Sequence, residues 1–150
     1  MIHRTVSTVV LIGMAIALTA PVSAQARAHI NPRHVNDEGG APPFSGAVGV
    51  GDLLFLSGTI GLQDGQVPES AEEEARLVME SMKSTIEAAG LTMDDLVSVQ
   101  VFCSDVDLYD IFNNVYRTYF TGNFPARAFV GSGTLLYGAR WEVQGIASKN

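Results

Sequence analysis

The 150-residue chain has one cysteine, Cys103, and only three histidines. A single cysteine excludes an intrachain disulfide. Because residues 99–103 alternate like a buried strand and no histidine is near, we expect a buried thiol rather than a nucleophile. The histidines do not have the spacing of metal ligands. The sequence therefore predicts neither a thiol enzyme nor a metal site.

Positive charge is also scarce, with nine Lys and Arg against sixteen Asp and Glu and a formal charge of −7. Removal of residues 1–24, in which Arg4 is the one charged residue, makes this −8. The negative electrostatic potential of such a chain repels phosphate backbones and anionic membrane surfaces. We therefore expect neither nucleic acid nor a membrane as a partner, although the net charge does not exclude a local basic patch.

The sequence lacks a hydrophobic run long enough for an ordinary membrane span. Val6 to Ala20 is apolar but short, follows Arg4, and is followed by small residues. We interpret residues 1–24 as a signal peptide cut between Ala24 and Gln25, with a second possible cut after Ala26. The chain is then exported and is periplasmic or secreted. The alternative is an uncleaved N-terminal anchor.

Two kinds of pattern follow the predicted signal. Residues 25–43 mix Pro, Gly, Asn and charged residues without an apolar period, which indicates a flexible arm. The folded domain is expected over residues 44–150. Phe44–Val50 and Leu53–Gly58 are predicted to be the two strands of a hairpin, joined by the tight turn Gly51-Asp52. Leu53 to Leu56 is apolar on both faces, which indicates an interior strand. Gly58 permits another backbone or a ligand to come close.

Two helices are predicted after the hairpin. Ser70 and Glu73 form a capping box before an apolar stripe that ends at Gly90. Asp107 is expected to cap a second helix, which Gly122 ends. A strand at Leu96–Cys103 separates the helices, and two strands follow them. The order indicates an α+β fold, a mixed sheet with both helices packed on one face.

The other sheet face is expected to be apolar and therefore covered by self-association. The residues assigned to it are Val48, Val50, Val97, Val99, Val101 and Ile146.

The last two strands carry the main candidate chemistry. Pro125 stiffens the turn before Arg127, and side chains alternate between faces along each strand. If the two strands are neighbours, Arg127 and Glu142 can meet in one pocket. The guanidinium would then bind a carboxylate through its planar fork, and Glu142 would hold or activate a water. The alternative is an ordinary ion pair on a sheet surface.

Several segments resemble one protein family, in order and at matching spacing from about residue 44 to residue 147. They are Ser57-Gly58-Thr59-Ile60, Ile86-Glu87-Ala88-Ala89-Gly90-Leu91, Tyr116-Arg117-Thr118-Tyr119-Phe120, Phe124-Pro125-Ala126-Arg127 and Glu142-Val143-Gln144-Gly145-Ile146-Ala147. This pattern is similar to the RidA family, also called YjgF/YER057c/UK114.

The resemblance implies a chorismate-mutase-like domain and a homotrimer with clefts between subunits. It also implies hydrolytic deamination of reactive 2-imino or enamine acids, such as 2-iminobutanoate, to 2-oxo acids and ammonia, without a metal or an organic cofactor. Arg127 falls on the substrate-binding arginine and Glu142 on the glutamate that positions water. Other positions expected at the site are Phe44, Ser57, Gly58, Asn113 and Phe129.

Some positions depart from the family pattern. Phe129 stands where cysteine is frequent and is expected to reshape the pocket. Phe44 lacks the hydroxyl of a tyrosine, Gln144 replaces an acidic residue, and residues 131–138 lack a leucine-proline turn. The main alternative to a deaminase is a non-catalytic trimer that binds a small carboxylate at Arg127. An endoribonuclease, as ascribed to some relatives, fits poorly with the negative charge.

Overall fold

The computed structural model describes residues 26–32 and 42–149, so the predicted signal peptide lies outside the described residues. The strands are β1 (Arg27–Ile30), β2 (Ala47–Val50), β3 (Leu53–Ile60), β4 (Leu96–Cys103), β5 (Ala126–Gly131) and β6 (Trp141–Ser148). The α-helices are α1 (Ala71–Ala88) and α2 (Tyr109–Tyr116). Short 3-10 helices are η1 (Met93–Asp95), η2 (Val106–Leu108), η3 (Arg117–Tyr119) and η4 (Leu136–Gly138).

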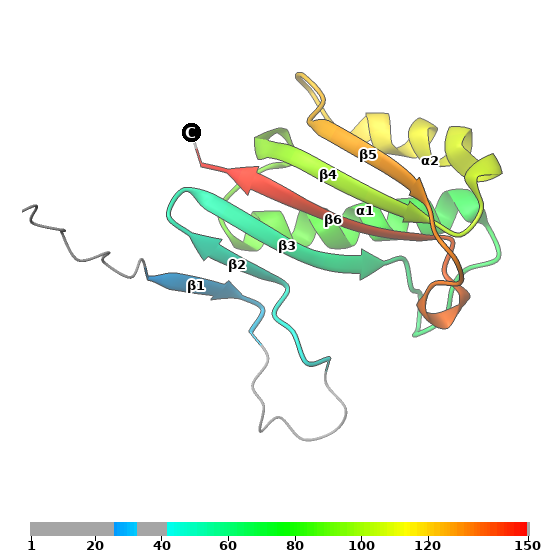
Figure 1. Cartoon of the computed structure of the whole chain (residues 1–150), viewed down its shortest axis with the longest axis horizontal. Helices are drawn as coiled ribbons and strands as arrows, with labels where there is room; N and C mark the ends of the chain where they lie inside the picture. Colours follow the sequence, from blue (N-terminus) through cyan, green and yellow to red (C-terminus); the bar gives the residue numbers. More distant parts are fainter. Residues whose placement is uncertain (1–25, 33–41, 150) are drawn as a thin grey trace, which may run out of the picture.

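The six strands form one mixed sheet in the order β1-β2-β3-β6-β4-β5. Only the β4–β5 pair is parallel among the described strands. Figure 1 shows α1 and α2 side by side behind this sheet, with its other face open. The mixed sheet with two helices on one face is therefore confirmed. No described helix is both long and apolar enough to cross a membrane.

Helix α1 begins as its sequence predicts. Ser70 is the N-cap, and its hydroxyl accepts a hydrogen bond from the Glu73 N–H at 3.3 Å. Gly90 follows the helix with φ of +77°, a conformation that glycine adopts without strain. Val78, Met79, Met82 and Ile86 are at most 1% exposed. Burial of each such side chain contributes about 1.5–3 kcal/mol, so the stripe anchors α1 to the sheet.

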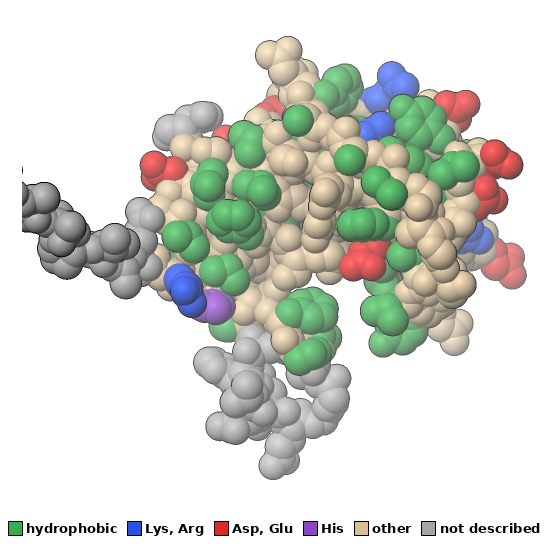
Figure 2. Space-filling view, viewed as in Figure 1, with side chains coloured by type: hydrophobic (Ala, Val, Ile, Leu, Met, Phe, Trp, Pro, Cys, Tyr) green, Lys and Arg blue, Asp and Glu red, His purple; other side chains and the backbone are tan. Residues whose placement is uncertain are grey.

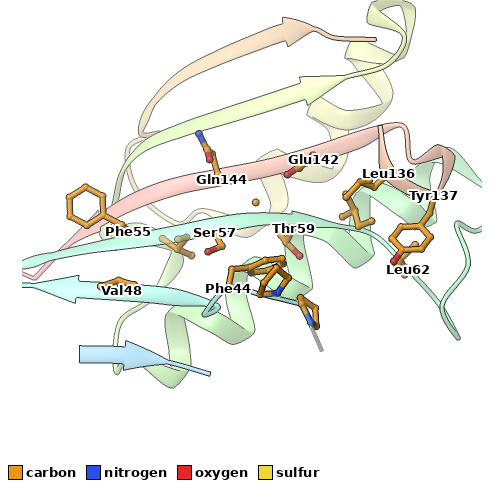
Figure 3. A pocket seen from close by; sticks show the side chains of 15 residues that line it. Phe44, Val48, Phe55, Ser57, Thr59, Leu62, Leu136, Tyr137, Glu142 and Gln144 are labelled. Carbon is orange, nitrogen blue, oxygen red and sulfur yellow. The ribbon is translucent and has the colours of Figure 1, made fainter. Parts of the chain in front are cut away.

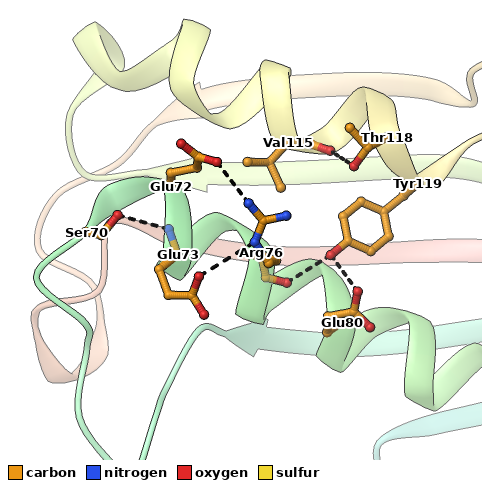
Figure 4. Close-up of polar contacts among 8 residues, drawn as sticks. All are labelled: Ser70, Glu72, Glu73, Arg76, Glu80, Val115, Thr118 and Tyr119. Atoms are coloured by element: carbon orange, nitrogen blue, oxygen red, sulfur yellow. Dashed lines mark hydrogen bonds and ion pairs between the residues drawn. The ribbon is translucent and has the colours of Figure 1, made fainter.

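Helix α2 begins later than its sequence predicts. Asp105, not Asp107, is the N-terminal cap, because its carboxylate accepts from the Asp107 N–H at 3.0 Å and starts η2 rather than α2. The far end of α2 continues into η3, which contacts α1. There the Tyr119 hydroxyl donates to Glu80 at 2.8 Å, and Arg76 pairs with two glutamates of its own helix (Figure 4).

The hairpin is confirmed, but both its boundaries and its surroundings differ from the prediction. The first strand begins at Ala47 rather than Phe44, and β3 continues to Ile60. Residues 27–30, expected in a flexible arm, form β1 and pair antiparallel with β2. Backbone pairing to an available sheet edge needs no apolar period, so the sequence pattern missed it. The rest of that arm lies largely outside the described residues.

The open sheet face carries exposed apolar side chains, visible as separate green groups in Figure 2. Those more than 40% exposed include Leu53, Phe55, Val97 and Val130. The assignment of Val99 and Val101 to this face was wrong. Both are fully buried on the helix side, because strand alternation places them with Cys103 rather than with Phe102.

Candidate functional site

Arg127 lies on β5, and its guanidinium is held by aromatic rings rather than by polar groups. Its Cζ atom is 4.6 Å from the ring centroid of Tyr116, and 5.9 and 5.7 Å from those of Tyr109 and Phe129. No ion pair involving Arg127 occurs among residues 26–32 and 42–149. The rings restrict the guanidinium while leaving its N–H edges for a carboxylate ligand.

The aromatic support of Arg127 comes mainly from α2. Tyr109, Asn113 and Tyr116 are three to four residues apart and so share one side of the helix. Asn113 is 5% exposed and lies on the side of α2 that carries these two tyrosines. Burial raises the pKa of Tyr116 to about 12, although the charge of Arg127 opposes this rise. Tyr116 is therefore a neutral ring and not a base near neutral pH.

Phe129 belongs to the same group of side chains. Its ring makes edge contacts with Tyr109 and Phe112, at centroid distances of 4.9 and 5.8 Å. It therefore packs between β5 and α2, beside Arg127. Its position two residues after Arg127 on a strand explains this shared side. We call Arg127, Asn113 and Phe129, with Tyr109 and Tyr116, the arginine half.

Glu142 lies on β6 beside an irregularity in β3. The β3–β6 register shifts between Leu56 and Thr59, which brings Gly58 against the Glu142 carboxylate. A Cβ atom at Gly58 would overlap that carboxylate, so only glycine permits this approach. The Ser57 hydroxyl donates to the Ser45 carbonyl at 2.7 Å, which ties this part of β3 to the segment before β2.

A cleft of about 990 Å³ opens at Glu142. In Figure 3, Leu136 and Tyr137 lie at one end of the cleft, and Phe44, Ser57 and Glu142 lie farther along it. Four of the predicted site residues therefore share this cleft, and we call them the glutamate half: Phe44, Ser57, Gly58 and Glu142.

The two halves do not meet within one chain, so the expectation of one pocket formed by neighbouring strands was wrong. Strand β4 lies between β5 and β6. Arg127 is level with Val99, which faces the helices, whereas Glu142 is level with Phe102 on the open face. Alternation along paired strands thus sends Arg127 and Glu142 to opposite sides of the sheet. The surface ion pair between them is excluded for the same reason.

Sequence reasoning missed a buried ion pair next to the glutamate half. Glu74 of α1 is fully buried, and its carboxylate accepts from Arg140 Nη1 and from the Arg140 backbone N–H, both at 2.6 Å. It also accepts from the Trp141 N–H at 3.3 Å. These bonds hold Arg140 and Trp141, the two residues that directly precede Glu142. Glu74 ends an acidic run at the start of the helix, Glu72-Glu73-Glu74, and nothing in the spacing of the run marks its third glutamate as buried.

Other residues offer little chemistry. No group of three or more His, Cys, Asp or Glu side chains that could hold a metal ion occurs in the described part of the chain. Burial raises the pKa of the Cys103 thiol, which donates to the Asp105 carbonyl at 2.8 Å. A raised pKa lowers the thiolate fraction, so this thiol is a poor nucleophile.

The chain is similar to proteins that are named for imine deamination. A 2-iminobutanoate/2-iminopropanoate deaminase of Dermatophagoides farinae is 36% identical over 107 residues, which covers 69% of this chain and 84% of the relative.

Solved structures agree with this likeness. Escherichia coli TdcF with bound serine superposes with a TM-score of 0.70 at 30% identity, covering 75% of this chain and 92% of TdcF. RidA of the Antarctic bacterium Psychrobacter sp. gives a TM-score of 0.69 at 28% identity, with 74% and 92% covered. The α+β architecture is thus the chorismate-mutase-like fold of these proteins. A family model described as endoribonuclease L-PSP matches residues 38–149. The chain therefore belongs to the endoribonuclease L-PSP family, which is the YjgF/RidA family.

Proposed function

We propose that this protein hydrolyses reactive 2-imino and enamine acids to 2-oxo acids and ammonia, at a site formed by the arginine half of one copy and the glutamate half of another. One observation carries the proposal. Arg127 and Glu142 each lack an ion-pair partner among the described residues, and they lie on opposite faces of their own sheet. Two copies can supply both groups to one substrate, whereas one copy cannot.

The reaction follows from the two groups. Arg127 binds the substrate carboxylate through two parallel N–H donors and fixes C2 of the imine. Glu142 accepts a hydrogen bond from a water and directs its oxygen to C2, where a C–O bond forms as the C–N π electrons move to nitrogen. Glu142 takes a proton from the attacking water and passes it to the amine nitrogen of the resulting carbinolamine. The C–N bond then breaks and ammonia leaves as the hydroxyl proton is lost and the C=O bond forms. Because a protonated imine is already electrophilic, positioning accounts for much of the required rate enhancement.

The exposed apolar residues of the open face support assembly. Phe55, Val97 and Val130 are each more than 40% exposed. Burial of such side chains against another copy stabilises an assembly. We propose that copies of the chain cover this face in the homotrimer that the family resemblance implies. Sedimentation that shows a monomer at micromolar concentration would contradict this assembly.

A competition assay tests the activity. An L-amino-acid oxidase generates imines that semicarbazide traps, and an imine deaminase lowers the rate of semicarbazone formation. We expect the protein to lower this rate, and we expect Arg127→Ala and Glu142→Gln each to abolish the effect. Arg117→Ala is the matched control, because Arg117 is exposed on η3. If Arg127 binds carboxylates but no imine is consumed, the protein is instead the non-catalytic ligand-binding member of the family.

Mixing the two inactive variants tests the shared site. An Arg127→Ala copy still supplies Glu142, and a Glu142→Gln copy still supplies Arg127. Random reassembly of equal amounts should restore about a quarter of the wild-type activity, because one in four pairings joins the two intact halves. A mixture that stays inactive after confirmed subunit exchange would contradict a site shared between copies.

We also propose export of the mature chain, on the basis of the sequence of residues 1–24. N-terminal sequencing of the protein recovered outside the cytoplasm should begin at Gln25 or at Arg27. An intact Met1 on the recovered protein would contradict cleavage.

A further inference from the structure

Apolar side chains dominate the surroundings of both charged groups. Three aromatic rings lie within 6 Å of the Arg127 guanidinium carbon. Next to Glu142, the cleft is lined by Phe44, Leu62, Leu136 and Tyr137, and Glu142 is its one charged residue among the described lining. A carboxylate and an imine nitrogen need only a few polar contacts, so this lining is suited to another part of the ligand.

Large apolar side chains at the edge of the cleft are exposed to solvent. We call the edge formed by Leu136 and Tyr137 the lip. Phe44 is 52% exposed, Leu136 is 69% exposed and Tyr137 is 73% exposed. Figure 3 shows the Tyr137 ring and the Leu136 side chain at one end of the cleft, with Phe44 farther along it. Water contact with these side chains is unfavourable unless something apolar covers them.

The backbone holds this lip in an uncommon conformation. Tyr137 has φ of 58° and Gly138 has φ of 72°, so a bulky side chain stands in the left-handed region. Such strain at a non-glycine residue persists only where the surrounding structure enforces it, and it is frequent at ligand sites. The turn therefore presents the Tyr137 ring at the cleft despite a conformational cost.

We propose that the preferred substrates are 2-imino acids with large apolar side chains, branched aliphatic or aromatic, and that this side chain packs between Phe44 and the Leu136–Tyr137 lip. This inference rests on the proposed deaminase function and specifies its substrate class. Each additional buried methylene strengthens binding about four-fold. A side chain two or three carbons longer than that of 2-iminobutanoate therefore gains at least ten-fold in kcat/KM, provided that it enters the cleft.

The test compares imines that an L-amino-acid oxidase generates in situ from 2-aminobutyrate, leucine and phenylalanine. Each rate of imine hydrolysis is corrected for the rate at which the oxidase forms that imine. We expect kcat/KM for the leucine-derived and phenylalanine-derived imines to exceed that for 2-iminobutanoate by about ten-fold or more. Equal values, or a preference for 2-iminobutanoate, would overturn the inference but leave the proposed function standing. Hydrolysis of none of the three would overturn both.

Two variants locate the selectivity. Tyr137→Gly removes the ring and suits the observed positive φ, so it is expected to fold. Leu136→Ala shortens the second lip side chain. Both should lower the leucine-to-2-aminobutyrate ratio by about three-fold or more. Val106→Ala is the control, because Val106 is 55% exposed and does not line the cleft.

Two results from these variants would overturn the inference. One is an unchanged ratio in both lip variants. The other is a change of oligomeric state without a change of ratio, which would show that a second copy rather than a substrate covers the lip.

Discussion

Two arginines of this chain have opposite environments. Arg140 at the start of β6 has its guanidinium paired with buried Glu74, and it also donates to the carbonyls of Pro68 and Glu69 at 3.0 and 2.9 Å. Arg127 on β5 has three rings around it and no ion-pair partner among the described residues. The first guanidinium makes three hydrogen bonds within its own chain, whereas the second is surrounded by rings that do not use its N–H donors.

Arg140 serves structure, whereas the proposed function assigns Arg127 to ligand binding. Hydrogen-bond donors already used by Glu74 and by backbone carbonyls are not available to a ligand. Aromatic faces restrict a guanidinium without using its N–H groups, so its donors stay free for a carboxylate. Loss of Arg140's partner should therefore affect stability, whereas loss of Arg127 should affect activity.

The largest expected effect is on activity at Arg127. Arg127→Lys keeps the positive charge but loses the planar fork, so we expect kcat/KM for imine hydrolysis to fall about 100-fold or more. The free energy of unfolding should change by less than about 1 kcal/mol, because the lost contact is a partly exposed cation–π interaction. Unchanged turnover in the competition assay would remove Arg127 from the site.

Glu74→Gln should have the largest effect on stability. The substitution removes a buried charge that holds Arg140 and two backbone N–H groups, so we expect the free energy of unfolding to fall by about 2–4 kcal/mol. Urea denaturation measures this difference. The matched control is Glu72→Gln, because Glu72 pairs with Arg76 at the surface and should change stability by less than about 0.5 kcal/mol. Equal losses of stability in the two variants would contradict the distinction between the buried Glu74–Arg140 pair and the surface Glu72–Arg76 pair.

Gly58→Ala should lower activity more moderately. The added Cβ would displace the Glu142 carboxylate, whose side-chain end can move, so the fold should persist. We expect kcat to fall about ten-fold while the thermal midpoint changes little, because only the orientation of the water is disturbed. Gly133→Ala is the control, since a Cβ there would meet nothing within 4 Å. A fully active Gly58→Ala protein would argue against a role for Glu142.

The smallest expected effect concerns Asp94 and is identified by its dependence on pH. Hydrogen bonds from the Thr121 hydroxyl and N–H lower the pKa of Asp94 from its usual 3.8. A lowered folded-state pKa stabilises the protein above pH 3.8, and this contribution is lost as the pH falls through the folded value. Thr121→Val should therefore lower the thermal midpoint slightly at about pH 6, and the difference should shrink toward about pH 2. A difference that grows on acidification would contradict this assignment.

Local signals in the sequence predicted most individual elements. The Ser70 cap, the methionine-bearing stripe and Gly90 defined α1, and strand β4 has its predicted bounds. The prediction failed where it depended on which strands are neighbours. Arg127 and Glu142 lie on consecutive strands of the chain, but β4 separates those strands in the sheet. Which face each side chain occupies depends on that order and on the register, and no local pattern encodes either.

The structure places the predicted site residues in two separate sets rather than in one pocket. Phe44, Ser57, Gly58 and Glu142 meet at one cleft, and Asn113 and Phe129 accompany Arg127. Glu74 escaped notice because a glutamate in the first turn of a helix is usually solvated. Its burial depends on Arg140, which is 66 residues away in the sequence.

Placement of Arg127 and Glu142 on opposite faces has a consequence for how the protein is handled. Under the proposed function, an isolated copy carries two incomplete sites and no complete one, so turnover per chain should depend on total protein concentration. Progressive dilution should abolish the activity through dissociation while the separate copies stay folded. The protein concentration at half-maximal turnover would then report the dissociation constant of the assembly.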